Sequence, residues 1–385
     1  MNEVRLGIIG IGNMGRGHID YMMEGKWNRV KLTAVCDTNP EKLEWVKERN
    51  LDVECFTTDE DFFEKAPVDA VIIATPHYSH PPLAIEAFKH GMHVLCEKPA
   101  GVYTRQVREM NEAAVKSGKV FGMMFNQRRN PVYQKVRDLV QNGELGEMKR
   151  VVWIITNWYR SQSYYDSGTW RATWEGEGGG VLLNQDPHQL DLWQWMCGMP
   201  TKIRAFMKFG IHRNIEVEND VTAYAEYANG ATGLFVTSTH ESPGTNRLEI
   251  SGDRGKIVVE NDIITFHRTR ITESQFNAEC TCGFGEPECW TFQVPVQGYN
   301  DAHAGIVNNF ASAILDGTEL MAPGVEGING LTLSNAMHMS AWTDSTIDLA
   351  TLDEDKFYDL LQERIKNSTQ KKKENDVTLN VKGTH

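Results

Sequence analysis

The segment RLGIIGIGNMG, residues 5–15, sets the architecture of the first half of the chain. A short apolar run is followed by a G-x-G-x-x-G sequence and then by a helical stretch. The first glycine permits a tight turn, the second lets the backbone approach a pyrophosphate, and the third lets helix and strand pack closely. Free N–H groups at the helix start would face the phosphates. We therefore predict a dinucleotide site whose phosphate contacts are Gly10, Ile11, Gly12, Asn13, Met14 and Gly15.

An acidic residue then indicates which dinucleotide is bound. The next apolar run, KLTAVCD, ends at Asp37, about 20 residues beyond the glycines, where a dinucleotide fold carries an acid for the ribose hydroxyls. A carboxylate at this point repels a 2′-phosphate, so the sequence favours NAD over NADP. The alternative is that Asp37 is only a loop acid before Asn39-Pro40.

Strand and helix patterns alternate as far as residue 126, which indicates a Rossmann-type domain. The near-continuous apolar run VDAVIIATP, residues 68–76, is typical of a buried parallel strand. A last strand, VFGMMFNQR at 120–128, would deliver Asn126 and Arg128 to the carboxyl edge of the sheet; for Arg128, a surface charge at a helix start is the equal alternative. The further cofactor contacts that we expect are Thr75, Pro76, His77, His80, Glu97, Lys98, Asn126 and Arg128.

The tripeptide Glu97-Lys98-Pro99 follows the short apolar strand His93 to Cys96. Pro99 fixes its own φ angle and biases Lys98 away from the helical region, so a stiff turn presents the ammonium group. In open parallel sheets, ligands bind just outside the carboxyl ends of the strands. Alone, the tripeptide is typical of a solvated surface turn, but inside this domain it predicts a functional lysine.

The pattern changes near residue 130. One helix, Pro131 to Asn142, precedes a series of β-type runs, and Asn229-Gly230 between two of them is a strong hairpin signal. Helices return late in the chain, before a short strand, TIDLA. We predict an α/β protein with an N-terminal Rossmann domain and a C-terminal α+β domain that holds a large, open, mainly antiparallel sheet. The ranges expected are 1–127 and 128–365 for the two domains, 366–385 for a flexible polar tail, and 303–316 and about 328–343 for the late helices.

The segment GEGGGVLLNQDPHQLDLWQWMCGMP, residues 176–200, contains a helix start at Pro187. Asp186 precedes this proline, and Gln189 would complete a capping box. A helix cap is therefore favoured for Asp186 over a catalytic acid.

His188 lies in the first turn of the same helix, where the helix N-terminus lowers the imidazole pKa and favours a neutral base. Asn184, just before the helix, can hydrogen-bond but cannot exchange a proton. Asp191 lies on nearly the same helical face as His188, and we expect it to be a structural hydrogen-bonding residue.

Composition excludes several classes of protein. With 385 residues and a formal net charge of -13, the chain is long enough for two domains and unsuited to non-specific nucleic-acid binding or to an anionic membrane surface. No apolar run approaches the roughly 20 residues of a membrane span, and the N-terminus lacks the regions of a signal peptide, so we expect a cytoplasmic protein. Cys280, Cys282 and Cys289 lack the paired spacing of a zinc site, and we expect no metal.

Taken together, these motifs resemble the Gfo/Idh/MocA family of nicotinamide-dependent sugar oxidoreductases, over nearly the whole chain. The resemblance implies a Rossmann domain and a C-terminal domain whose open sheet forms a homodimer or homotetramer interface. It also implies that Lys98 binds substrate and nicotinamide, and that His188 is the acid–base residue. The segments that carry it are GIGNMG, ATPHYSH, EKP, FNQRRNP, GELGEMKRV, GGGVLLNQDPHQLD and EISGDRGKIVVE.

One departure from the family pattern bears on the substrate. The family usually has Asp where this chain has Asn184, and glycine is common where it has Asp186, which disfavours an inositol-dehydrogenase-like assignment. The segments WRATWEGEGGGVLLNQ (170–185) and GFGEPECW (283–290) resemble a subgroup that oxidises glycosides or free sugars at C3.

We therefore predict an NAD-dependent dehydrogenase of a sugar or glycoside hydroxyl, in which the substrate hydroxyl hydrogen-bonds Lys98 and His188. The alternatives are a glycoside-cleaving enzyme that oxidises its substrate transiently with bound NAD, an inositol dehydrogenase, and a non-catalytic nucleotide-sensing regulator. Aromatic rings in residues 157–174 are expected to stack on a sugar, although about half would pack the domain interface instead. The predicted catalytic residues are Lys98, His188 and Asn184; the predicted substrate contacts are Lys98, Arg128, Tyr159, Trp170, Arg171, Asn184, Asp186 and His188.

Overall fold

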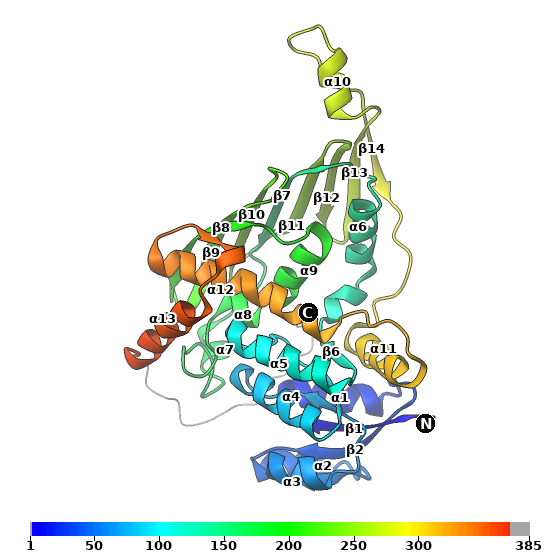
Figure 1. Ribbon diagram of the computed structural model, residues 1–385, viewed down its shortest axis with the longest axis vertical. Helices are drawn as coiled ribbons and strands as arrows, with labels where there is room; N and C mark the ends of the chain where they lie inside the picture. The colour runs from blue at the N-terminus through cyan, green and yellow to red at the C-terminus, as the bar shows by residue number, and fades with distance from the viewer. Residues whose placement is uncertain (1, 370–385) are drawn as a thin grey trace.

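The computed structural model describes residues 2–369, which form two sheets with their covering helices (Figure 1). The first sheet has 6 strands in the order β3-β2-β1-β4-β5-β6, and every pairing in it is parallel. This is the predicted Rossmann sheet. Its strands are β1 (Val4–Ile9), β2 (Val30–Cys36), β3 (Glu54–Phe56), β4 (Ala70–Ile73), β5 (His93–Cys96) and β6 (Phe121–Met123).

Strand order reverses between β1 and β4, which are neighbours in space, so the chain winds outward from this point in both directions. All residues of β4 are buried, as expected for a parallel strand covered on both faces. A crevice for ligands forms at such a reversal, outside the carboxyl ends of the strands. The connecting helices are α1 (Asn13–Met23), α2 (Pro40–Lys47), α3 (Asp59–Lys65), α4 (His80–Lys89) and α5 (Thr104–Ser117).

The second sheet has 9 strands in the order β14-β13-β12-β11-β7-β10-β9-β8-β15. Its pairings are antiparallel except that of β7 with β10, so the predicted mainly antiparallel sheet is confirmed as a mixed one. The hairpin predicted at Asn229-Gly230 joins β9 to β10. The strands are β7 (Met148–Ile155), β8 (Lys202–Phe209), β9 (Glu218–Glu226), β10 (Thr232–Ser238), β11 (Asn246–Gly252), β12 (Gly255–Glu260), β13 (Ile263–Thr269), β14 (Cys289–Val294) and β15 (Ile347–Asp348).

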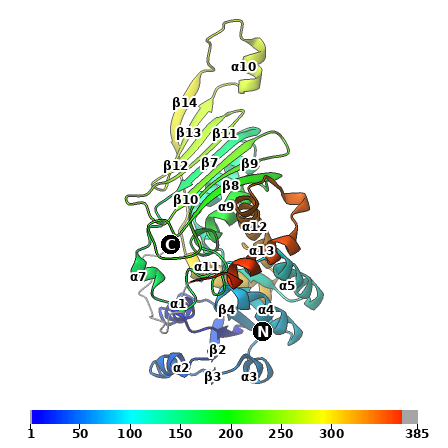
Figure 2. The same cartoon turned by 90° about the vertical axis from the view of Figure 1, so that its left-hand side faces the viewer.

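One face of the second sheet is covered by helices and the other is open (Figure 2). Alternate residues of β8, such as Ile203 and Ala205, are buried toward the helices, whereas Phe206 is exposed. Tyr224 on β9 is exposed in the same way. The covering helices are α6 (Pro131–Gln141), α9 (Pro187–Cys197) and α12 (Gly327–Thr343).

The chain crosses between the two sheets more than once. Helix α11 (Ala302–Asp316) lies beside the Rossmann sheet (Figure 1), and Met123 N–H donates to the Ala322 carbonyl at 3.0 Å. The predicted division near residue 127 stays a prediction. Helix α13 (Glu354–Lys366) ends where the polar tail was predicted, and residues 370–385 of that tail lie outside the described residues.

A protrusion extends the second sheet at its β13–β14 edge and carries α10 (Glu273–Glu279), as Figure 1 shows. The sulfurs of Cys280 and Cys282, which follow α10, lie 3.4 Å apart, and Phe284 is fully exposed. Within residues 2–369, no helix has the length and apolar character needed to cross a membrane.

Candidate active site

The glycine loop after β1 has the form that a dinucleotide requires. Gly10 has φ +96°, and a side chain there would lie 2.6 Å from the Ala74 carbonyl oxygen. A side chain on Gly15 would lie 2.0 Å from the Gly10 carbonyl oxygen, so helix α1 can pack here only through glycine. At Gly12, the first residue before α1, the space within 4 Å of a side-chain position holds no atom. That open space lies where a pyrophosphate would meet the helix N-terminus.

Asp37 follows β2 directly and is buried at this loop. Its Oδ2 accepts the Ile11 N–H at 2.7 Å, its Oδ1 accepts the Asn39 N–H at 2.9 Å, and Lys42 Nζ lies 3.5 Å away. The carboxylate is therefore fixed beside the glycine loop, which is the position from which an acid reaches the adenosine ribose.

Asn126 lies just beyond β6, in the 3-10 turn η2 (Asn126–Arg129) and not in the strand itself. It is 3% exposed, its Nδ2 lies 3.4 Å from His303 Nδ1, and its Oδ1 has no hydrogen-bond partner among the described residues. A buried acceptor without a partner is costly unless a ligand or water satisfies it. With the open glycine loop and the fixed Asp37, this orphaned oxygen fits a bound nicotinamide dinucleotide.

Lys98 connects the two domains. Its Nζ donates to the backbone carbonyl of Asn184 at 2.8 Å, across from the carboxyl end of β5 to the helix α8 (Val181–Asn184). Burial lowers the pKa of the ammonium group, and nearby Arg171 lowers it further, while Glu97 and Glu177 act in the opposite direction. The charge on Lys98 thus depends on groups from both domains.

His188 lies in the first turn of α9 and is 4% exposed. Burial lowers its pKa well below the usual value, and the charge of Lys98 lowers it further, so the imidazole is neutral at pH 7. Its Nδ1 has no hydrogen-bond partner among the described residues. An ammonium group and a neutral imidazole at one crevice can together polarise a hydroxyl group and accept its proton.

Glu97, predicted as a cofactor contact, is instead held inside the Rossmann domain. Its Oε1 pairs with His18 Nε2 at 2.8 Å, and its Oε2 accepts the Lys98 backbone N–H at 3.2 Å. Burial alone would raise the pKa of this carboxyl, but the hydrogen bond and charge of His18 bring it down to about 2. Glu97 is therefore a fixed negative charge behind Lys98.

A second carboxylate, from the C-terminal domain and missed by the sequence analysis, also acts on the charge of Lys98. Glu177 is 2% exposed, and its Oε1 accepts a short hydrogen bond from Asn184 Nδ2. Asn184 Oδ1 accepts from the Tyr164 hydroxyl at 3.4 Å, and that hydroxyl accepts from Arg171 Nη1 at 3.0 Å. Asn184 is thus joined to Arg171 through the Tyr164 hydroxyl and to Glu177 through its own amide.

His303 was also missed. It comes from α11, far along the chain, and stacks on Tyr21 with ring centroids 5.8 Å apart. Burial lowers its pKa to about 4, so it is a neutral group facing Glu97 and Lys98.

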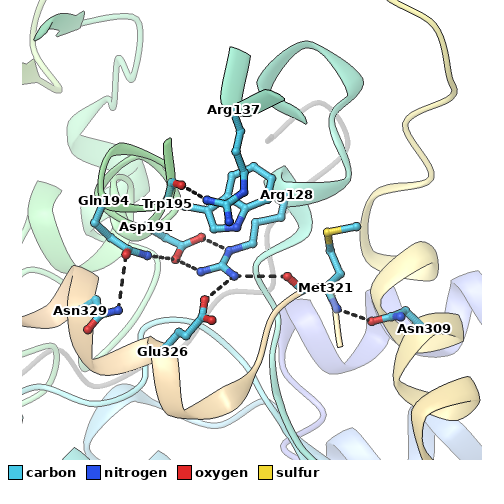
Figure 3. Close-up of polar contacts among 9 residues, drawn as sticks. All are labelled: Arg128, Arg137, Asp191, Gln194, Trp195, Asn309, Met321, Glu326 and Asn329. Atoms are coloured by element: carbon cyan, nitrogen blue, oxygen red, sulfur yellow. Dashed lines mark hydrogen bonds and ion pairs between the residues drawn. The ribbon is translucent and has the colours of Figure 1, made fainter. Parts of the chain in front are cut away.

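Arg128 was predicted to contact cofactor and substrate, but its guanidinium is 1% exposed and is held by side chains and a backbone carbonyl inside the protein (Figure 3). Nε and Nη2 form a bidentate pair with Asp191 at 2.7 and 2.6 Å. Nη1 donates to Glu326 at 2.6 Å and to the Met321 carbonyl at 3.2 Å. Arg128 thus joins η2 to helix α9 and to the 3-10 turn η3 (Gly324–Glu326), which directly precedes α12, and Asp191 has the structural role predicted for it.

His80 also differs from its prediction as a cofactor contact. Its Nδ1 lies 2.7 Å from the Pro99 carbonyl oxygen and its Nε2 lies 2.8 Å from that of Thr75. It therefore braces the turn that carries Lys98 instead of facing a ligand. His77 Nδ1 lies 3.0 Å from the Glu177 carbonyl oxygen, so it joins the two domains. Thr75 and Pro76 follow β4 at the carboxyl edge, where the prediction put them.

The capping box predicted at α9 is wrong. Asp186 occupies the cap position, but its side chain makes no capping hydrogen bond. It is completely buried and faces Thr237 and Trp158, and burial raises its pKa to about 7.

Two predicted aromatic contacts differ in outcome. Trp170 packs edge to face with His77, their ring centroids 5.5 Å apart, and Arg171 lies over the Trp170 ring at 4.7 Å from its centroid. Tyr159 is half exposed under Arg213, and no contact brings it to Lys98. Among the described residues of this segment, it is Tyr164 that reaches Asn184.

Fold and site define the class: a dinucleotide-binding protein with an ammonium group and a neutral imidazole at the crevice between its domains. Two family models match the chain. Residues 4–125 match an oxidoreductase family with an NAD-binding Rossmann fold, and residues 133–258 match the GFO/IDH/MocA C-terminal domain. The chain therefore belongs to the GFO/IDH/MocA family of oxidoreductases, and its first domain is an NAD(P)-binding Rossmann domain.

Relatives agree with this assignment. The chain is 25% identical to an inositol 2-dehydrogenase of Rhizobium meliloti over 90% of this chain and 99% of the relative. It is 28% identical to a D-glucoside 3-dehydrogenase of Escherichia coli over 62% and 70%. The solved structure of the WlbA dehydrogenase from Bordetella pertussis, in complex with NADH and UDP-GlcNAcA, is 27% identical with a TM-score of 0.76, covering 91% of this chain and 100% of that one.

Proposed function

We propose that the protein is an NAD-dependent dehydrogenase that oxidises a secondary hydroxyl of a sugar or glycoside at C3, or reduces the matching ketone. The observation that carries the proposal is the hydrogen bond from Lys98 Nζ to the Asn184 carbonyl, beside the neutral His188. The names of the inositol and D-glucoside dehydrogenases above support a polyhydroxylated substrate. Asn184 in place of the family's usual acid favours the glucoside over the inositol type.

In the oxidation, the substrate hydroxyl hydrogen-bonds to Lys98 and His188. His188 accepts the hydroxyl proton, for which the neutral imidazole is the competent form. Lys98 stabilises the oxygen through its charge and a hydrogen bond as negative charge develops there. Bound NAD⁺ supplies the acceptor for the hydride that leaves the carbinol carbon. In the reverse direction, His188 returns the proton.

NAD is proposed as the cofactor, in preference to NADP, because of Asp37. Its carboxylate is held by the backbone N–H groups of Ile11 and Asn39. A 2′-phosphate on the ribose would bring its negative charge against this fixed one. The Asn126 amide, with its orphaned oxygen, is the proposed contact for the nicotinamide end.

Trp170, Arg171 and Tyr164 are the proposed platform for the sugar. Arg171 lies 4.7 Å from the Trp170 ring centre and 4.8 Å from that of Tyr164, so two aromatic faces and a guanidinium adjoin Lys98. Aromatic faces suit the apolar C–H side of a sugar, and the guanidinium suits its hydroxyl oxygens.

The open face of the second sheet is the proposed contact between copies of the chain. Phe206 and Tyr224 expose large rings there, which favours a homodimer or homotetramer. Light scattering should report a mass of two or four chains, and Tyr224→Asp should shift it toward one.

The test of the proposed activity is a screen of sugars, glycosides and inositols for NADH absorbance. We expect steady NADH formation with glycosides or free sugars, and none when His188 is replaced by Ala. Release of an aglycone without NADH would favour a glycoside-cleaving enzyme, strong activity with inositols alone would favour an inositol dehydrogenase, and cofactor binding without turnover would favour a regulator.

A further inference from the structure

We infer that Glu177 is a positioning residue of this site: held by Asn184, it supplies a second negative charge that, together with Glu97, keeps Lys98 a charged ammonium group. The inference deepens the proposed function and rests on it for the catalytic role of Lys98. In this interpretation, the Glu177–Asn184 pair supplies the negative charge that a single carboxylate at position 184 would otherwise supply.

The glycines on either side of Glu177 pack closely against neighbouring residues. Gly178 has φ +81°, and a side chain there would lie 2.3 Å from Val102. A side chain on Gly176 would lie 2.4 Å from the Trp170 carbonyl oxygen. The chain therefore packs closely on both sides of Glu177, against the Trp170 backbone at Gly176 and against the Val102 side chain at Gly178, and the Glu177 side chain itself is almost completely buried.

The hydrogen bonds of Glu177 are those of a carboxylate. Oε2 accepts the Ala172 backbone N–H at 2.6 Å, and Oε1 accepts from Asn184 Nδ2. A backbone N–H can only donate, and the Asn184 oxygen is already used by the Tyr164 hydroxyl, so the amide is oriented to donate to Glu177. Both oxygens thus act as acceptors, which is the pattern of the ionised form.

Asn184 links this carboxylate to Lys98 directly. Its backbone carbonyl accepts from Lys98 Nζ at 2.8 Å, while its own side chain donates to Glu177. One residue therefore holds both charged groups, and movement of either would disturb the other.

The other charges at this place show why the carboxylate matters. Arg171 and Arg160 both disfavour the charged form of Lys98, as does burial. Two carboxylates favour it, Glu97 more strongly than Glu177, and Glu97 is also paired with His18. Glu177 is the acid that is not paired with a cation at hydrogen-bond distance, although Arg171 acts on it at longer range.

The carboxyl of Glu177 is also in a range where it responds to pH. Burial, with the repulsion of the buried Glu218, raises its pKa to about 6, against the opposing effects of Arg171, the Ala172 N–H and the Asn184 amide. Above this value Glu177 is ionised and supports the ammonium form of Lys98, and below it that support is lost.

The test measures the titration of Lys98 in the full chain by trace labelling with acetic anhydride at a series of pH values, read by mass spectrometry of the Lys98 peptide. In Glu177→Gln we expect the Lys98 midpoint to fall by about one pH unit or more. The matched control is Glu175→Gln, an exposed acid in the same loop, which should leave the midpoint unchanged.

A second variant excludes a merely structural effect. Combining Glu177→Gln with Asn184→Asp moves the carboxylate to position 184 and reverses the amide–carboxylate pair. We expect this double variant to restore the Lys98 midpoint and, with a substrate in hand, to recover most of a roughly tenfold loss of kcat seen in Glu177→Gln, with KM little changed.

An unchanged Lys98 midpoint in folded Glu177→Gln, or a double variant that does not recover it, would overturn the inference. If Glu177→Gln does not fold, Glu177→Asp takes its place and must retain a midpoint near that of the wild type. The labelling needs no substrate, so it decides the role of Glu177 even if no sugar is oxidised. If instead the wild type oxidises a sugar and the Lys98 midpoint is the same in Glu177→Gln, the inference fails but the proposed function stands.

Discussion

Glu97 and Glu177 are both buried glutamates acting on Lys98, one from each domain, yet the two carboxyl groups are held very differently. Glu97 is bonded to a ring nitrogen of His18, and its pKa lies at about 2. Glu177 faces backbone and amide N–H groups, and its pKa lies at about 6. Two glutamates that are almost equally buried therefore have different pKa values because their hydrogen-bond partners differ.

The two domains therefore provide different kinds of negative charge near Lys98. The Rossmann domain provides a negative charge that persists at any physiological pH. The C-terminal domain provides one that depends on pH and on the position of Asn184. Lys98 lies between them, so its charge is set partly by a permanent group and partly by an adjustable one.

The largest expected effect comes from removing the residue that the two glutamates share. Lys98→Ala should lower kcat by about 10²–10³-fold, because the group that stabilises the developing charge is lost. NAD binding, measured by calorimetry, should persist, since the glycine loop and Asp37 are untouched. Lys89→Ala, an exposed lysine on α4, is the control. Near-wild-type turnover in Lys98→Ala would remove the basis for the whole site.

The next largest effect is on stability and concerns Glu97. Glu97→Gln should lower the free energy of unfolding at pH 7 by roughly 3 kcal/mol, because the buried carboxylate that bonds to His18 is lost. The pKa of Glu97 is depressed on folding, so its contribution is present above about pH 4.5 and is lost as pH falls toward 2. Urea unfolding at pH 7 and pH 3 should therefore show a smaller difference from the wild type at the lower pH.

Glu177→Gln should have a much smaller effect on stability, within about 1 kcal/mol at pH 7, since relief of a buried charge offsets a lost hydrogen bond. Here the sign is opposite. The pKa of Glu177 is raised on folding, so its favourable contribution is present below about pH 4.5 and is lost as pH rises through about 6. Equal pH dependence of unfolding for the two glutamine variants would contradict the contrast between the two carboxylates.

A further effect, on cofactor choice instead of stability, concerns a third carboxylate, Asp37. Asp37→Ser should reduce the preference for NAD over NADP by about tenfold, through removal of one repelling charge. The ratio of kcat/KM values for the two cofactors measures it. If the ratio does not change, the choice of cofactor is made elsewhere in the loop.

Much of this could be predicted from the sequence because the signals are local. The glycine loop, Asp37 and the Lys98 turn each follow a recognisable strand, and parallel strands bring their carboxyl ends to one edge. His188 was identifiable from a helix start. In each case a few consecutive residues determine the geometry.

The rest depends on contacts between distant segments. Arg128 has the position of a ligand-binding residue, but Asp191 and Glu326, from two other helices, enclose it. Asp186 occupies the sequence position of a helix cap, yet its buried side chain makes no capping hydrogen bond. Glu177 offered one signal, an acid inside a run of glycines, but only the fold brings it to Asn184.

The parallel pairing of β7 with β10 could not be predicted for the same reason. The two strands are separated by many residues, so their pairing follows from packing and not from a turn sequence. The protrusion that carries α10 likewise has no periodic signal that distinguishes it from an ordinary loop.

The most direct test of the central claim follows the hydrogen atom that leaves the substrate. A D-glucoside deuterated at C3 is incubated with the protein and NAD⁺, and the reduced cofactor is examined by mass spectrometry. We predict that NADH carries the deuterium and that Lys98→Ala yields almost none. Unlabelled NADH would place the reaction at another carbon, and the absence of any reduced cofactor with this and other sugars would contradict the proposed dehydrogenase.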